Sequence, residues 1–215
     1  MKTKLLTIAM TAALMFTAMT KVQAQNFDGP CLPPAHGLVD HQSAFCGVMQ
    51  AIALATGANY VSFFIDITLD DLKTALLATG NTDILIKSKT QSTNYQGGRW
   101  RGSLTWDVSK MYIIQVGESC EIAFEGLPMD PTQHPITVVN GSTYIGFPLD
   151  ESMSLTNAFA GFAVNGDIIL SKSGSAQYTG GRWRGTSLTN LEPGKGYIYK
   201  SSQTGNRTLV FPSSK

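Results

Sequence analysis

One hexapeptide, Gly-Gly-Arg-Trp-Arg-Gly, occurs twice in this chain, at residues 97–102 and 180–185. The flanking residues continue the match at an offset of 83 to 85 positions, which indicates two copies of one structural unit. A strand, turn or helix expected in one copy therefore has to recur in the other. The matched pairs include Tyr60 with Tyr144, Phe63 with Phe147, Asp66 with Asp150, Asp83 with Asp167, and Tyr112 with Tyr197.

The pattern within each copy predicts a mainly β fold of the α+β class, in which a mostly antiparallel sheet packs against one short helix. In the first copy, Ile52–Leu54 and Tyr60–Ile65 are expected to be strands joined by a tight turn. Thr68 precedes two acids and a helical spacing of apolar residues that stops near Gly80, which predicts a capped helix. The corresponding helix of the second copy is expected from Ser152 or Ser154 to Phe162.

Further strands follow each helix, and the boundaries of the units come from the change in pattern. We expect strands at 83–87, 111–116 and 121–124, and again at 136–139, 167–171, 197–200 and 208–211. The predicted organisation is a signal peptide (1–24), an irregular lead-in (25–50), repeat 1 (51–126), a proline-rich connector (127–135) and repeat 2 (136–215).

The repeated hexapeptide predicts a hairpin with two chemically different sides. The paired glycines supply the positive φ angles of a two-residue turn, so Tyr95 faces Trp100 and Tyr178 faces Trp183 across the strands. The arginines alternate with the tryptophans and therefore project from the opposite face. These basic residues are Arg99, Arg101, Arg182 and Arg184.

The N-terminal residues are typical of an exported protein. Lys2 and Lys4 precede an apolar run from Leu5 to Met19, and Val22-Gln23-Ala24 fits a cleavage site before Gln25. We expect the product in the periplasm, at the cell surface or outside the cell, with no transmembrane span. Removing the signal lowers Lys plus Arg from 16 to 13 against 15 Asp plus Glu, so a nucleic-acid partner is not expected.

Three cysteines in an exported chain make one disulfide plausible. Cys31 and Cys46 are the candidate pair, and Cys120, within an apolar alternation, is expected to be a buried free thiol. His36, His41 and Cys46 lack the spacing of a zinc site, so no metal and no cofactor are predicted.

Several strings of the second copy resemble a repeat found near the C-termini of many exported and surface proteins of Bacteroidetes-type bacteria. They are Tyr144-Ile145-Gly146-Phe147-Pro148, Gly166-Asp167-Ile168-Ile169, and Leu191-Glu192-Pro193-Gly194-Lys195-Gly196-Tyr197. The family usually has Trp where this chain has Tyr60 and Tyr144, and the first copy has Val108-Ser109-Lys110-Met111-Tyr112 in place of the glycine-rich turn. The resemblance implies an accessory or surface-display module and supplies no catalytic residue set.

Two sets of repeat residues are candidates for ligand binding. Tyr95, Trp100, Tyr178 and Trp183 either form stacking platforms for sugars or pack inward and hold each hairpin to the core. If they pack inward, the four arginines become the exposed candidates, since guanidinium groups bind anionic sugars and acidic protein surfaces. The other interpretation of the arginines is a solvated strand face without a ligand.

These features predict an exported, non-catalytic binding or adhesion module at the bacterial surface, with a glycan or a surface protein as partner. The alternative is a structural spacer or a self-assembling surface subunit. A glycoside hydrolase is less favoured, because it needs two carboxylates about 5 to 10 Å apart in a cleft. Asp66, Asp83, Asp150 and Asp167 are shared too evenly between the copies to nominate such a pair.

Overall fold

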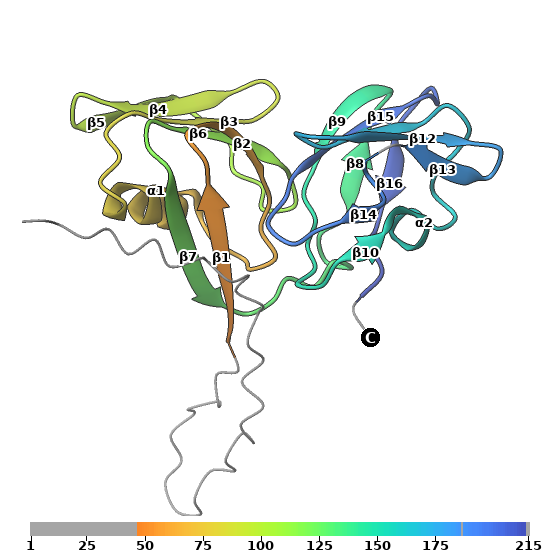
Figure 1. Cartoon of the computed structure of the whole chain (residues 1–215), viewed down its shortest axis with the longest axis horizontal. Coiled ribbons are helices and arrows are strands. Elements are labelled where there is room, and N and C mark those ends of the chain that lie inside the picture. Colours follow the sequence, from red (N-terminus) through yellow and green to blue (C-terminus); the bar gives the residue numbers. More distant parts are fainter. Residues whose placement is uncertain (1–46, 186, 214–215) are drawn as a thin grey trace, which may run out of the picture.

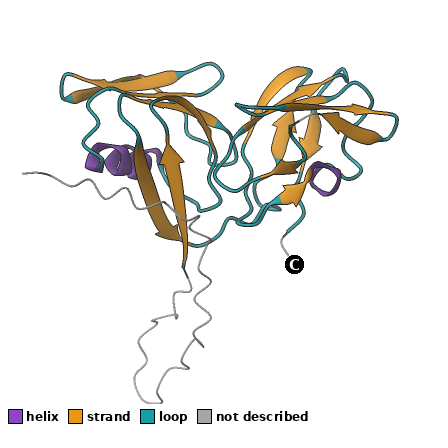
Figure 2. Ribbon diagram, in the orientation of Figure 1, coloured by secondary structure: helices purple, strands orange, loops and turns teal. Residues whose placement is uncertain are grey.

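The computed structural model describes residues 47–185 and 187–213 of the 215-residue chain. The predicted signal peptide, residues 25–46 of the lead-in and the candidate pair Cys31 and Cys46 lie outside the described residues. Within them the chain forms two strand-rich halves that lie side by side (Figure 1). The small share of helix is evident in Figure 2. The mainly β class predicted from the sequence is confirmed.

Each half contains its own complete set of elements. The first half comprises β1 (Val48–Leu54), β2 (Gly57–Val61), α1 (Leu69–Ala78), β3 (Ile84–Lys87), β4 (Ser92–Gln96), β5 (Arg99–Ser103), β6 (Tyr112–Val116) and β7 (Cys120–Gly126). The second half comprises β8 (Ile136–Val138), β9 (Gly141–Ile145), β10 (Met153–Ser154), α2 (Leu155–Ala158), β11 (Ile168–Leu170), β12 (Ser175–Thr179), β13 (Arg182–Gly185), β14 (Asn190–Leu191), β15 (Tyr197–Ser201) and β16 (Arg207–Leu209).

The two halves have the same sheet topology. A five-stranded antiparallel sheet with the order β2-β6-β3-β4-β5 has its counterpart in the order β9-β15-β11-β12-β13. The two-stranded ribbon β1-β7 likewise corresponds to β8-β16, and α1 corresponds to α2. The small pair β10-β14 belongs to the second half. Figure 1 shows both five-stranded sheets along the upper side of the molecule, with the helices beneath them.

The hairpin formed by the repeated hexapeptide has the predicted register. Tyr95 pairs with Trp100 and Tyr178 pairs with Trp183. The φ angles of Gly97 and Gly98 are 61° and 80°, a conformation that costs glycine little and other residues more. The second turn repeats it, with φ of 61° and 78°.

The helix of the first half is capped as the sequence predicts. The Thr68 side chain accepts from the backbone N–H of Asp71, and the Asp71 carboxylate accepts from the backbone N–H of Thr68. Leu72 and Leu76 are its buried residues. The second helix is shorter than expected, because it ends at Ala158 and the chain turns at Gly161 with a φ of 70°.

The predicted hairpin between the first two strands is wrong. β1 pairs with β7 and β2 pairs with β6, so the chain passes from one sheet to the other between Leu54 and Gly57. The buried Asn59 side chain holds this crossing, because its amide group bonds both the N–H and the carbonyl of Ala55, at 3.1 and 2.7 Å. The strand predicted to reach Ile65 ends at Val61.

Each half has its own apolar core, and a tyrosine at matched positions is buried in each core. The Tyr112 hydroxyl accepts from the backbone N–H of Asp107 at 2.7 Å, and the Tyr197 hydroxyl accepts from that of Glu192 at 2.7 Å. The Tyr112 hydroxyl also donates to the carbonyl of Asp107 at 3.1 Å, and burial raises the pKa of Tyr112 to about 12.

The halves meet through contacts that are reciprocal. Ser62 donates its N–H to the carbonyl of Gly194 at 3.1 Å, and Gly146, the counterpart of Ser62, donates to that of Ser109, the counterpart of Gly194, at 2.8 Å. When each half offers the same groups to the other, the interface is isologous and has two-fold symmetry. The two halves are therefore related by a pseudo-two-fold axis.

Two further pairs follow the same symmetry. Met111 and Gly196 occupy equivalent positions and face one another, since a Cβ on Gly196 would lie 2.8 Å from Met111 Cβ and closer still to its Cγ. Lys89 of the first half donates to the carbonyl of Ser142 at 2.5 Å, while its counterpart Lys172 lies 3.5 Å from Asn59 Oδ1, one residue after the position equivalent to Ser142. This arrangement brings β2 and β9 together at the middle of the molecule.

Candidate binding surface

The outer faces of the two five-stranded sheets form a surface on which every charged residue is basic. No acidic residue occurs within these strands, and all the basic ones are exposed. We call these outer faces the basic sheet surface. Its charged residues are Lys87, Arg99, Arg101, Arg182, Arg184 and Lys200.

Strand alternation explains why the arginines point outward. In β5 and β13 the tryptophan between each pair of arginines is half-buried and packs against the core of its own half. Trp100 lies 5.4 Å from Tyr95 between ring centroids, and Trp183 lies 5.3 Å from Tyr178. The four aromatic candidates are thus on the core side of the hairpins, and the four arginines are on the solvent side.

Each arginine lies beside an uncharged hydrogen-bonding side chain on the same face. Arg101 is paired with Asn94 and Arg99 with Gln96. In the second half Arg184 is paired with Gln177 and Arg182 with Thr179. Among the described residues, no ion pair involves any of the four arginines. Their guanidinium groups remain available to an external anion.

The middle of the basic sheet surface is less polar. Tyr60 pairs with Ile113 on β6, and its counterpart Tyr144 pairs with Ile198 on β15; all four are half-buried. Burial, and then the neighbouring Tyr60, raise the pKa of Tyr144. The two tyrosines are therefore close to each other across the junction. They join the two sheet faces into one surface with basic ends.

In the first half, acidic residues lie in the layer opposite the sheet. Asp70 and Asp71 are in the first turn of α1, and Glu121 and Glu125 are exposed on β7. Figure 1 shows both elements beneath the five-stranded sheet of the first half. In the first half the sheet thus carries only basic charges, whereas α1 and β7 carry four acids and one lysine, Lys73.

The aspartates shared by the two copies have different environments. Asp83 is exposed, whereas Asp167 is fully buried and accepts from the Tyr199 hydroxyl at 2.6 Å, the Ser202 N–H at 2.7 Å and Arg207 Nη2 at 2.8 Å. Burial disfavours its charge, but these hydrogen bonds outweigh burial and lower the pKa of Asp167. Sequence reasoning missed this cluster, because its members are far apart in the chain.

Three further observations concern single residues and elements of the described ranges. Cys120 is a free thiol among the described residues and is half-buried, less than expected. Within residues 47–185 and 187–213, no group of three potential ligand side chains converges as a metal site requires. Neither helix in these ranges is long and apolar enough to cross a membrane.

Comparison with protein-family models, with curated proteins and with solved structures found no match to this chain. The candidate surface is therefore assigned from its own geometry and charge.

Proposed function

We propose that this chain is an exported, non-catalytic binding module of the bacterial surface, and that the basic sheet surface holds an acidic polysaccharide. The observation that carries the proposal is the exclusive presence of cations on the outer faces of both five-stranded sheets. A ligand that touches both ends of this surface must be extended and must carry repeated negative charge.

The uncharged residues of the surface support a sugar polymer as the ligand. Asn94, Gln96 and Gln177 offer amides beside the arginines, and such groups bond sugar hydroxyls. Tyr60 and Tyr144 at the centre offer aromatic area with a polar tip, which suits a pyranose ring. The basic ends then bind carboxylate or sulfate groups by charge-assisted hydrogen bonds.

The test is binding of the purified chain to an array of neutral and acidic glycans, beside a variant with Arg99, Arg101, Arg182 and Arg184 all changed to Ser. We expect selective binding to acidic glycans that is at least about tenfold weaker in the variant, since losing 1.4 kcal/mol is sufficient for that. Raising the ionic strength should weaken binding to the wild type.

Lys110→Ser is the matched control, because Lys110 is an exposed cation that already pairs with Asp107 at 2.8 Å and lies outside the basic sheet surface. It should bind as the wild type does. A wild type that binds no acidic glycan, or a four-arginine variant with unchanged binding and an unchanged melting temperature, would show that the proposal is wrong.

A further inference from the structure

The first strand of the ribbon has one edge without a strand partner in the part of the chain that the structure describes. β1 pairs with β7 along its whole length, from Val48 with Gly126 to Leu54 with Cys120, and that ribbon has only two strands. The Gln50 side chain, on the buried face of β1, donates to the carbonyl of Ser62 and accepts from the N–H of Phe64. Within the described ranges, the backbone of β1 makes no hydrogen bond at its second edge.

This open edge faces a cleft between the two halves. The cleft encloses about 530 Å³ and is lined by three consecutive residues of β1, namely Ala51, Ile52 and Ala53. Because neighbouring side chains of a strand point to opposite faces, three in a row line a cleft only where the backbone edge faces it. Unpaired N–H and C=O groups of β1 are therefore directed into the cleft.

The edge lacks the features that normally protect a strand from pairing. β1 has the sequence VMQAIAL, with no charge and no proline. The edge strands β5 and β13 each carry two arginines, and β8, the counterpart of β1, has three residues and follows Pro135. Among these edges, β1 is the one suited to accept another strand.

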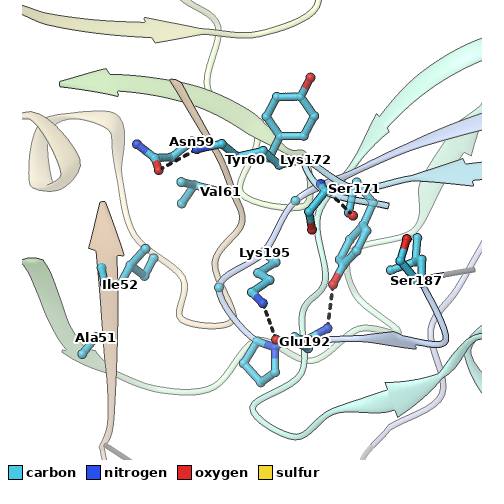
Figure 3. Close-up of a pocket in the computed structure, with 17 residues that line it drawn as sticks. Ala51, Ile52, Asn59, Tyr60, Val61, Ser171, Lys172, Ser187, Glu192 and Lys195 are labelled. Atoms are coloured by element: carbon cyan, nitrogen blue, oxygen red, sulfur yellow. Dashed lines mark hydrogen bonds and ion pairs between the residues drawn. The ribbon is translucent and has the colours of Figure 1, made fainter. Parts of the chain in front are cut away.

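The opposite wall of the cleft is polar and carries a cation. In Figure 3, β1 with Ala51 and Ile52 lies on one side, Ser171, Lys172 and Ser187 lie on the other, and Lys195 and Glu192 lie between them. Lys195 is neutralised by its ion pair with Glu192. Lys172 is exposed and forms no ion pair within the described residues, its hydrogen-bond acceptor being the uncharged Asn59 Oδ1.

We propose that this cleft binds an extended, acidic peptide segment of a partner protein, which adds as a strand to the free edge of β1 and places a carboxylate against Lys172. Main-chain hydrogen bonds to Ala51–Ala53 supply the docking, as in other cases of strand addition. Lys172 supplies charge complementarity. The cleft borders the basic sheet surface, because Tyr60 belongs to both, but none of the four arginines lines it. Peptide binding therefore does not depend on the arginines.

The probe is a set of acetylated hexapeptides of alternating Thr and Val, in which a single Asp is moved through every position. Binding at millimolar peptide is followed by backbone amide shifts of the isotope-labelled full chain. We expect the largest shifts at Ala51–Ala53 and Ser171–Ser173. An extended peptide has two alternating sets of backbone nitrogens, and only one set faces β1. Methylating that set should abolish binding, because the added strand then cannot donate to β1.

Two lysine variants test the charge. Lys172→Glu should weaken the best peptide about tenfold, as should replacing its Asp by Asn, because each removes the charge-assisted hydrogen bond. Lys200→Glu is the matched control, because Lys200 is an exposed cation that does not line the cleft. It should bind the peptide as the wild type does, and so should the four-arginine variant.

Three results would overturn the proposal. The first is that no peptide changes the backbone amide shifts of β1, or that peptides methylated on either set of nitrogens still bind. The peptide binds only after residues 25–46 are deleted, in which case the chain's own segment is the occupant. Or dilution of the wild type changes the β1 shifts as a dimer dissociates, in which case a second copy is the occupant.

Discussion

A buried carboxylate in the second half joins segments that the repeat pattern does not connect. Asp167 bonds Tyr199 on β15, Ser202 after that strand and Arg207 on β16. In the first half Ile114 stands at the position equivalent to Tyr199, and the equivalent carboxylate, Asp83, is exposed. An aspartate at matched positions is thus a buried hydrogen-bonding group in one copy and an exposed residue in the other.

Asp167→Asn should destabilise the protein by about 3 kcal/mol, because it leaves the guanidinium of Arg207 without its counter-charge in a largely buried site. Asp83→Asn is the matched control and should change the free energy of unfolding by less than about 0.5 kcal/mol, since Asp83 is exposed. Urea unfolding of the three proteins measures both effects. Equal stability of the two variants would contradict the structural role of Asp167.

The same residue predicts a dependence on pH. The folded state lowers the pKa of Asp167, so its ionised form stabilises the fold above the unfolded pKa, which is about 3.9 for Asp. This contribution is lost as the pH falls through the lower, folded pKa. The difference in unfolding free energy between wild type and Asp167→Asn should therefore shrink when urea unfolding at pH 7 is repeated near pH 3. A constant difference would exclude an ionised Asp167.

At the scale of elements, local rules predicted the hairpins and the first helix, while the path between sheets required contacts distant in sequence. The glycine pair and the alternation around Trp100 suffice for the turn and its register, because both act within a few residues. The hairpin predicted between β1 and β2 is wrong, because a turn signal does not specify which strands become neighbours in a sheet. β1 pairs with β7 and β2 pairs with β6, and β6 and β7 are the last two strands of the first half in sequence.

Gly98→Ala tests whether the hairpin turn requires glycine only because of its backbone conformation. Gly98 has a φ of 80°, and no atom lies within 4 Å of the position that a Cβ would take, so the expected loss of about 1 to 2 kcal/mol comes from the left-handed backbone. Gly117→Ala is the control, since a Cβ there makes ordinary contacts beginning at 3.8 Å without a positive φ. Thermal unfolding should show a lower melting temperature for Gly98→Ala only. A comparable loss in both variants would contradict this account.

At the scale of the whole molecule, the pseudo-two-fold junction aligns the two sheet faces and forms the cleft beside β1. Sequence repetition predicted two units but not their junction, because its bonds join residues as far apart as Ser62 and Lys195. The candidate arginines could be named from alternation alone. Their place on one shared surface, and the cation Lys172 opposite a free strand edge, depend on how the halves pack.

The pair at the axis provides the sharpest test of this junction. Two methionines would collide there and two glycines would leave a void, whereas Met111 fills the space that Gly196 leaves. Gly196→Ala should cost about 1 to 3 kcal/mol, because its Cβ would overlap Met111 Cγ and would also lie 2.8 Å from Met111 Cβ.

Met111→Ala should also destabilise, by about 2 to 5 kcal/mol, because Met111 is fully buried and its loss leaves a cavity. The double variant should be more stable than the sum of the two losses predicts, by about 1 kcal/mol or more, since it lacks the Met111 Cγ that the new methyl group would otherwise overlap. A double-mutant cycle by urea unfolding gives this coupling energy. Losses that add within about 0.5 kcal/mol would mean that the two residues do not face one another, and the junction described by the reciprocal hydrogen bonds would have to be revised.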